Sequence, residues 1–96
     1  MTINMSKFGY VLTSRQAGKD AYAAFLPTLS EIKSGDVVVV DFEGVNTFSP
    51  SWGDEFLTPL HERFGDAVTL TNASNPSVAL TLETLEGIHG YKFTVA

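Results

Sequence analysis

The sequence predicts an α/β domain with a mixed, mostly parallel central sheet packed against about three helices. Two observations support this fold class. Four consecutive valines at 37–40 form an unbroken apolar run, which is typical of a buried strand in a parallel sheet. Apolar residues recur at helical spacing in three other segments, and short strand-like runs lie between them. We expect one domain over residues 1–96, because a chain of this length can bury one modest core.

The first third of the chain is expected to contain short strands and then a helix. Residues 3–5 and 8–12 are apolar, which favours two short strands or a hairpin. Ser14 offers a helix cap, and the apolar positions after it predict a helix over 15–32. Pro27 lies inside this helix, and we expect it to kink the helix or divide it into two pieces.

The middle of the chain carries the strongest structural signal. The valine run predicts a strand over 37–42 that is covered on both faces, with helices on each side of the sheet. A helix is predicted over 51–64, and Pro59 is expected to interrupt it. One apolar stripe repeats every four residues along this helix, at Trp52, Phe56, Leu60 and Phe64.

The last third is expected to run strand, helix, strand. A strand is predicted over 67–71, and Asn75-Pro76 is typical of a helix start. The apolar alternation at 78–82 also fits a strand, but the cap and Gly87 favour a helix. A closing strand is predicted over 91–95.

Composition excludes several classes of function. The chain is 18% charged with a net charge of −5, which argues against nucleic acid as its partner. No cysteine is present, and no apolar run approaches the roughly 20 residues of a membrane-spanning helix. Because a secretory signal is lacking too, we expect a cytoplasmic protein without membrane contact. His61 and His89 lack partners at metal-ligand spacing, and no phosphate-loop motif occurs, so we expect no metal and no cofactor.

The stretch from the central strand into the next helix contains the candidate functional residues. Partners and ligands of open α/β sheets bind beyond the carboxyl ends of the central strands. The N-terminus of a helix also offers free N–H groups and a partial positive charge, which stabilise a phosphate or another anion. The candidates are Asp41, Gly44, Ser49, Pro50, Ser51, Trp52, Asp54 and Glu55, together with Arg15 at the start of the first helix.

The polar candidates allow two interpretations each. Ser51 with Asp54 approximates a capping box, and Ser49 before a proline is an equally good cap. Carboxylates at Asp41, Asp54 and Glu55 fit acid–base chemistry. In the other interpretation, Asp41 binds loop amides, and the partial positive charge at the helix N-terminus stabilises Asp54 and Glu55.

Trp52 and Arg15 are also open to more than one interpretation. Trp52 fits an exposed anchor for a partner, and it fits the buried stripe of its helix. Arg15 fits a pair with a carboxylate near the loop, a contact to a partner, or a solvated side chain.

The run VVVVDFEGVNTFSPSWGDEF, at 37–56, resembles the STAS-like family, a domain of unknown function. Its members carry a strand, a D-F-x-G-V turn and an S-P-S-F-x-D-E helix start, and a similar Ser-Arg pair precedes their first helix. The resemblance covers about residues 8–80 and implies a STAS-like layered fold. Phenylalanine is usual at Trp52, and alanine is common at Gly53.

The wider STAS class includes bacterial anti-sigma-factor antagonists, and this resemblance implies a function. In those proteins a kinase related to histidine-kinase ATPases phosphorylates a serine at a D-S-S-G helix start. By position, Ser51 matches that phosphoacceptor, Ser49 the preceding aspartate, and Asp41 the aspartate that ends the central strand. The present chain reads Ser-Pro-Ser-Trp at this motif.

We therefore expect a non-enzymatic bacterial signalling module that binds a protein. The resemblance implies a histidine-kinase-like ATPase or an anti-sigma-type regulator as the partner, with phosphorylation of Ser51 as a switch. The alternative is a sensor of a small molecule or nucleotide that binds at the 43–51 loop and helix N-terminus. An enzyme is the third hypothesis, but nothing in a chain of this length indicates an enclosed cleft.

Overall fold

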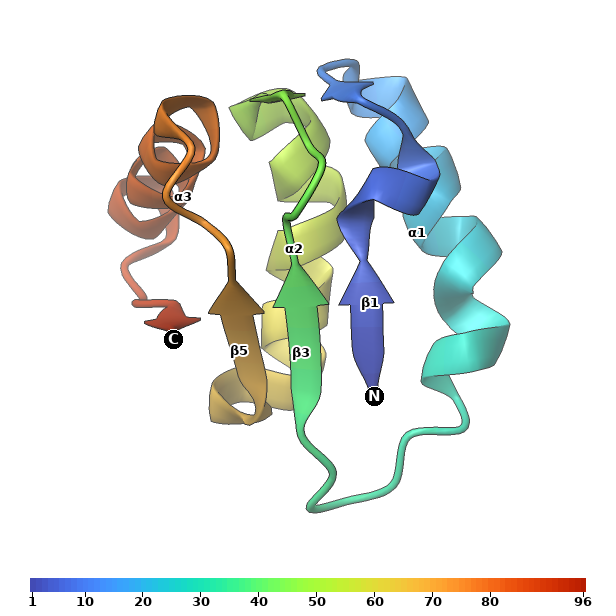
Figure 1. The fold of residues 1–96 in the computed structure, drawn as a ribbon. Helices are drawn as coiled ribbons and strands as arrows, with labels where there is room; N and C mark the ends of the chain where they lie inside the picture. Colours follow the sequence, from blue (N-terminus) through green and yellow to red (C-terminus); the bar gives the residue numbers. More distant parts are fainter.

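A computed structural model describes every residue from Met1 to Ala96 and shows an α/β fold (Figure 1). The main sheet is parallel and has the strand order β1 (Thr2–Asn4), β3 (Val38–Asp41), β5 (Val68–Thr71) and β6 (Thr94–Val95). A second, two-stranded parallel sheet joins β2 (Val11–Leu12) to β4 (Thr47–Phe48). The helices are α1 (Arg15–Leu29), α2 (Pro50–Phe64) and α3 (Pro76–His89), with short 3-10 turns η1 (Met5–Phe8) and η2 (Gly65–Ala67).

The three long helices start at polar caps, and two of these caps are those that the sequence predicts. The Ser14 hydroxyl accepts a hydrogen bond from the Ala17 amide at 2.9 Å. The side chain of Asn75 accepts from the Ser77 and Val78 amides at the start of α3. A side-chain oxygen at this position satisfies amides that have no partner inside the helix.

All three helices lie on one face of the main sheet, so the prediction of helices on both sides is wrong (Figure 1). The chain adds its strands in one direction, from β1 to β6, and right-handed crossovers in one direction place every helix on the same side. Val38 and Val40 are buried against the helices, whereas Val39 is only half-buried and Val37 is exposed.

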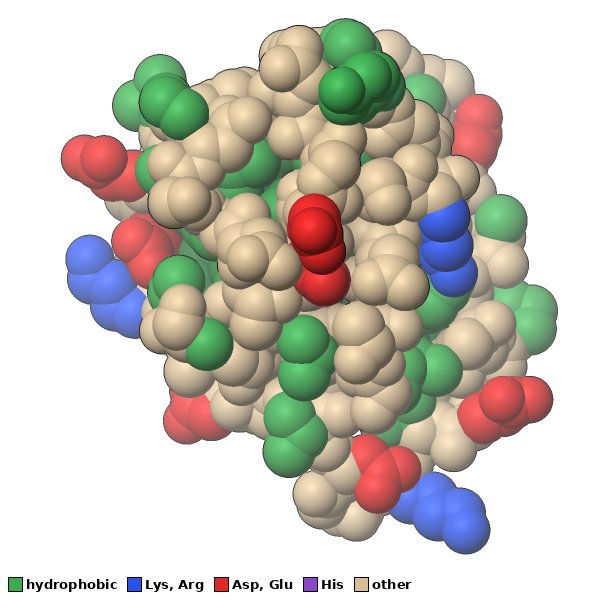
Figure 2. All heavy atoms as spheres, in the orientation of Figure 1, with side chains coloured by type: hydrophobic (Ala, Val, Ile, Leu, Met, Phe, Trp, Pro, Cys, Tyr) green, Lys and Arg blue, Asp and Glu red, His purple; other side chains and the backbone are tan.

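The uncovered face of the sheet is mainly polar. Thr2, Val39, Thr69 and Thr94 pair with one another across the four strands and form one row on this face. Figure 2 shows the same side of the molecule, where apolar side chains are scattered and do not gather into one patch. A row that is rich in threonine lets this parallel sheet keep one face in water.

The two interior prolines do not divide their helices. Pro27 lies two residues before the end of α1, which ends at Leu29 and not at residue 32. Pro59 lies inside α2, which continues without a break to Phe64. Phe56 and Leu60, on either side of Pro59, are fully buried, and this packing holds the helix together although proline lacks an amide donor.

The core lies between the helices and the sheet, and aromatic side chains dominate it. Trp52 stacks on Phe56 with 5.3 Å between ring centroids, and Phe8 contacts both rings from η1. The predicted stripe on α2 is therefore confirmed. α1 crosses α2 at Gly18, where an added Cβ atom would lie 2.5 Å from the carbonyl oxygen of Trp52.

Residues 3–12 form two short strands and not a hairpin, because β1 pairs with β3 and β2 pairs with β4. The 3-10 turn η1 separates these strands. The closing strand β6 is shorter than the predicted 91–95. The structure therefore confirms the α/β class with a parallel sheet and three helices.

Candidate functional site

The candidate site is the segment between β3 and α2, at the carboxyl ends of the strands (Figure 1). The predicted 43–51 loop contains the short strand β4, and we call the whole segment the β3–α2 loop. This loop is fastened to the N-terminal segment by backbone hydrogen bonds. The amides of Asn46 and Thr47 donate to the Tyr10 carbonyl at 2.9 and 3.3 Å, and the Ser49 amide donates to the Leu12 carbonyl at 2.9 Å. Residues from two distant parts of the chain thus form one surface.

Asn75, the cap of α3, fastens the same loop from the other side. Its side-chain NH2 donates to the carbonyls of Val45 and Asn46 at 3.3 and 3.0 Å. Val45 itself is buried, so the loop is also held by the core beneath it. The loop is consequently a rigid feature of the fold, since both its backbone and one side chain are engaged.

Asp41 and Gly44 shape the beginning of the loop. Asp41 accepts hydrogen bonds from the side chain of Asn72 at 2.8 Å and from the Glu43 amide at 2.9 Å. These two donors, the Asn72 amide first, hold the pKa of Asp41 below its ordinary value. Gly44 has φ +86°, a backbone conformation that residues with a side chain rarely adopt. The interpretation of Asp41 as an acceptor for loop amides is confirmed.

Ser49, and not Ser51, is the cap of α2. Its hydroxyl accepts from the Trp52 amide at 3.3 Å and donates to the Thr13 carbonyl at 2.7 Å. The capping box of Ser51 with Asp54 is therefore wrong, because Pro50 already occupies the first helical position. Ser51 lies in the first turn, is half-buried, and uses its hydroxyl in no hydrogen bond within the protein.

Asp54 is the centre of a polar network that joins the three helices. It accepts from Arg15 of α1 at 3.1 Å, from His89 of α3 at 2.7 Å and from Thr58 of its own helix at 2.9 Å. Burial raises the pKa of Asp54, but the hydrogen bonds from His89, Thr58 and Arg15 outweigh it and hold the pKa below its ordinary value. Arg15 also pairs with Glu55 at 3.1 Å, which confirms the predicted pair with a carboxylate, although 54% of the Arg15 side chain stays exposed.

The hydrogen bonds to Glu55 and Asp54 raise the pKa of Arg15, so its charge is secured. Next to this network, Tyr91 stacks on His61 with 4.1 Å between ring centroids and on His89 with 5.6 Å. Burial raises the pKa of the Tyr91 hydroxyl, which lies 3.3 Å from the hydroxyl of Thr58. The network is thus built of structural contacts between α1, α2, α3 and the residues after α3.

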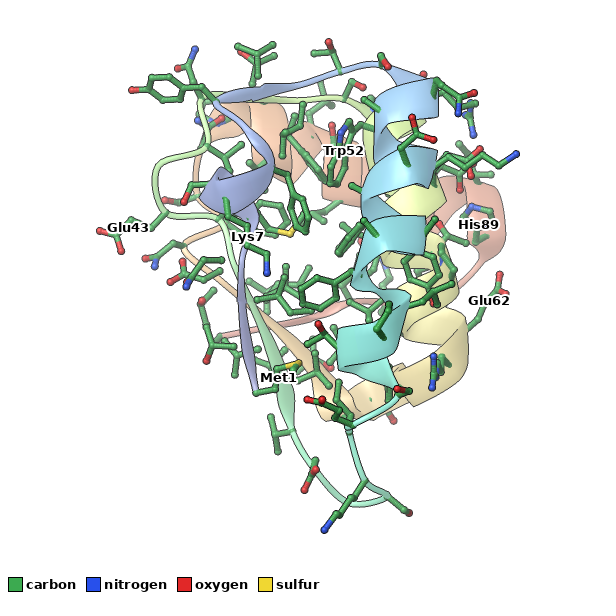
Figure 3. The ribbon with its side chains drawn as sticks, turned by 90° about the vertical axis from the view of Figure 1, so that its right-hand side faces the viewer. Met1, Lys7, Glu43, Trp52, Glu62 and His89 are labelled. Atoms are coloured by element: carbon green, nitrogen blue, oxygen red, sulfur yellow. The ribbon has the colours of Figure 1, made fainter.

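The structure separates Asp41 from the other two candidate carboxylates, Asp54 and Glu55, which both pair with Arg15. Asp41 follows Val40 on β3 and faces the open side of the sheet, where Asn72 binds it. Asp54 belongs to the helical layer, where Arg15 and His89 bind it. Figure 3 shows the separation, since Glu43 and His89, which are neighbours of these two sites, lie on opposite sides of the molecule.

Trp52 is buried, so its role as an exposed anchor for a partner is wrong. Only 1% of its surface is exposed, and it lies inside the molecule between the helices (Figure 3). Gly53 is buried too, and a Cβ atom there would lie 3.1 Å from the ring of Phe48 and 3.2 Å from Leu85. These two residues hold the start of α2 in place and do not contact solvent.

Sequence reasoning missed the exposed apolar residues next to the loop. Tyr10 is 70% exposed and Val11 is 58% exposed, although both belong to an apolar run that suggests a buried strand. The run forms only a two-residue strand, in which Leu12 points into the core and Val11 points out. The strict alternation of side chains in a strand is the signal that identifies one of them as a surface residue.

No helix of the structure is long and apolar enough to cross a membrane. A family model described as a STAS-like domain of unknown function (DUF4325) matches residues 18–78, which is more than half of the chain. The match runs from the first turns of α1 to the start of α3 and includes the whole candidate loop. It confirms the resemblance that the sequence indicates. Neither the curated proteins nor the solved structures contain a match to this chain.

Proposed function

The chain belongs to the STAS-like family of domains of unknown function, and we propose that it is a non-enzymatic module that binds a partner protein through the β3–α2 loop. Membership of this family suggests a regulatory interaction module. The observation that carries the proposal is the surface of the loop. It is rigid in backbone, and exposed residues of two chain segments project from it.

The interaction surface comprises Tyr10, Val11, Asn46, Pro50 and the half-buried Ser51. Tyr10 and Val11 are the exposed apolar residues that lie nearest the loop in the fold, because their segment hydrogen-bonds to it. Tyrosine is enriched among the residues that dominate protein–protein binding energy. A rigid loop also loses little conformational entropy on binding, which favours affinity.

The family resemblance supports a cytoplasmic partner of the histidine-kinase-like ATPase or anti-sigma type. Phosphorylation of Ser51 is the accompanying switch. Its hydroxyl has no partner within the protein and lies in the first turn of α2, where a helix stabilises negative charge. A phosphate there would add about two negative charges next to Pro50 at the start of α2 and would change how a partner docks.

The binding proposal is tested with the purified protein as bait in an extract of the native cytoplasm at low salt. We expect recovery of an ATPase or anti-sigma-type protein, and a large loss of recovery with Tyr10→Ser. Val37→Ser is the matched control, because Val37 is also an exposed apolar residue but lies at the opposite end of β3 from the loop. Equal recovery by all three proteins would contradict the proposed surface.

The switch is tested by incubation with the same extract and ATP, followed by intact-mass and peptide mass spectrometry. We expect one added phosphate, which is lost in Ser51→Ala and kept in Ser74→Ala, since Ser74 is exposed outside the surface. A chain that stays unmodified while it still binds its partner would remove the switch and leave the interaction module.

A further inference from the structure

The protein has one cavity, and it lies at the opposite end of α2 from the β3–α2 loop. It is an open hollow of about 320 Å³ between the turn that follows α1 and the carboxyl end of α2. Figure 1 shows both of these segments at the foot of the view. Its lining consists of Ile32, Lys33, Ser34, Gly35, Asp36, Arg63, Phe64 and Ala67. We call it the Lys33–Arg63 pocket.

Two exposed cations, Lys33 and Arg63, and one carboxylate, Asp36, line this pocket in a chain whose net charge is −5. Of the other four cationic side chains, Arg15 and Lys92 pair with carboxylates, Lys7 lies over the ring of Phe25, and Lys19 forms no ion pair. Arg63 itself lies over the ring of Phe64, with 5.2 Å from its guanidinium carbon to the ring centroid. Lys33 and Arg63 form no ion pair, although the carboxylate of Asp36 lies on the same lining. Two unneutralised cations therefore border one hollow.

The negative ends of the helix dipoles explain only part of this arrangement. Arg63 lies in the last turn of α2, where a cation is stabilised. Lys33, however, lies four residues beyond Leu29, the end of α1, and the dipole effect falls off within one turn. Both side chains nevertheless border the same hollow.

The turn at 33–36 adds hydrogen-bond donors to the lining. Its own hydrogen bonds use the amides of Lys33 and Asp36, which donate to the Asp36 carboxylate at 2.9 Å and to the Lys33 carbonyl at 3.0 Å. The amides of Ser34 and Gly35 have no acceptor within the protein. Gly35 has φ +92° and open space where a Cβ atom would lie.

The remaining walls of the pocket are apolar. Ile32 and Phe64 are half-buried residues that pack against the core, and Ala67 adjoins them. The volume of the pocket lies at the lower end of the ~300–1,000 Å³ that small-molecule sites occupy. The lining therefore combines cations and free amides with apolar side chains, which matches a ligand with a charged head and a small apolar body.

We propose that the Lys33–Arg63 pocket binds a small organic oxyanion, in which a phosphate or carboxylate group is attached to a short apolar chain or a ring. The oxyanion contacts Lys33, Arg63 and the amides of Ser34 and Gly35, and the apolar part contacts Ile32 and Phe64. This site is independent of the partner surface, which lies at the other end of the molecule. It also differs from a sensor site at the 43–51 loop.

The proposal is tested by ¹H–¹⁵N NMR titration of the full chain at low salt, with phenyl phosphate, benzoate, inorganic phosphate and phenol as separate probes. We expect saturable shifts of the Ser34, Gly35 and Arg63 amides with phenyl phosphate, benzoate or both. Phenol and inorganic phosphate should bind at least about fivefold more weakly, because each supplies only half of the contacts. Binding of one organic oxyanion but not the other would identify its head group.

Variants that each remove one positive charge distinguish binding in this pocket from non-specific attraction of the anionic probes to cationic side chains. Lys33→Gln and Arg63→Gln should each weaken the binding of the better probe by about five- to tenfold. Lys19→Gln removes the same charge from an exposed position on α1 and should leave binding unchanged. The proposal is overturned if no probe gives saturable shifts up to about 20 mM, if phenol binds as well as phenyl phosphate, or if all three variants behave alike.

Discussion

Gly18→Ala should destabilise this protein although alanine is the better helix former. Gly18 lies in the interior of α1, where replacing glycine by alanine normally stabilises a helix by about 1 kcal/mol. The new Cβ atom, however, would lie 2.5 Å from the carbonyl oxygen of Trp52 and 3.0 Å from its Cα. These are backbone atoms of α2, and they cannot rotate away as a flexible side chain can.

The clash therefore forces α1 away from α2. Overpacking of this kind costs about 1–3 kcal/mol, and the contact with backbone places Gly18→Ala toward the upper end. After the gain in helix propensity is subtracted, we expect a net loss of about 1–2 kcal/mol in the free energy of unfolding. In a domain of this size each kcal/mol corresponds to roughly 4–8 °C in Tm.

Gly87→Ala is the matched control. Gly87 lies within α3, is exposed, and has nothing within 4 Å of the position that a Cβ atom would take. We expect this variant to be more stable than the wild type by about 0.5 kcal/mol, because only the propensity changes. Urea unfolding followed by fluorescence of Trp52, the one tryptophan of the chain, measures both variants. A Gly18→Ala protein as stable as Gly87→Ala would refute the close approach of the helices.

Three further predictions concern the packing and polar contacts that hold the site. Phe56→Ala, at the fully buried centre of the aromatic cluster, should lower the free energy of unfolding by about 3–5 kcal/mol in the same urea assay. Thr81→Val removes a buried 2.6 Å hydrogen bond to the Phe48 carbonyl and should cost about 1 kcal/mol, whereas Thr84→Val, on the outer side of α3, should cost much less; equal losses would contradict the role of this contact. Because the folded-state pKa of Asp54 lies below its ordinary 3.8, the stability from this carboxylate is present above pH 3.8 and is lost as the pH falls through the folded-state pKa. As the pH is lowered below 3.8, the urea midpoint of Asp54→Asn should therefore fall less steeply than that of the wild type. Identical slopes of midpoint against pH would show that the contacts of Asp54 contribute no pH dependence.

Local signals in the sequence predicted most of the elements. Helix caps and an apolar stripe involve residues within a few positions of one another, so they can be recognised directly in the sequence. This holds for the caps Ser14 and Asn75 and for the stripe of α2. The family motif at 37–56 is local in the same sense, and the family match covers it. The breaks expected at Pro27 and Pro59 failed, because burial of the neighbouring side chains outweighs a lost hydrogen bond.

The candidate site was predicted in position but not in detail. The sequence placed it at the β3–α2 loop and proposed two caps for α2, and only the geometry selected Ser49. The pairing of Arg15 with Asp54 and Glu55 joins residues 39 and 40 positions apart, which spacing alone does not reveal. The exposure of Tyr10 depended on where a two-residue strand docks.

The sequence by itself determined the α/β class, the order of the three helices and the main-sheet strands, and the family to which the chain belongs, because contiguous patterns of apolar, capping and motif residues contain this information. It did not predict β4. Tertiary structure decided which face of the sheet the helices cover, which side chains surround the loop, and that Lys33 and Arg63 share one pocket. The physical reason is that these features depend on the direction in which strands are added and on contacts between residues far apart in the chain, and neither leaves a local pattern in the sequence.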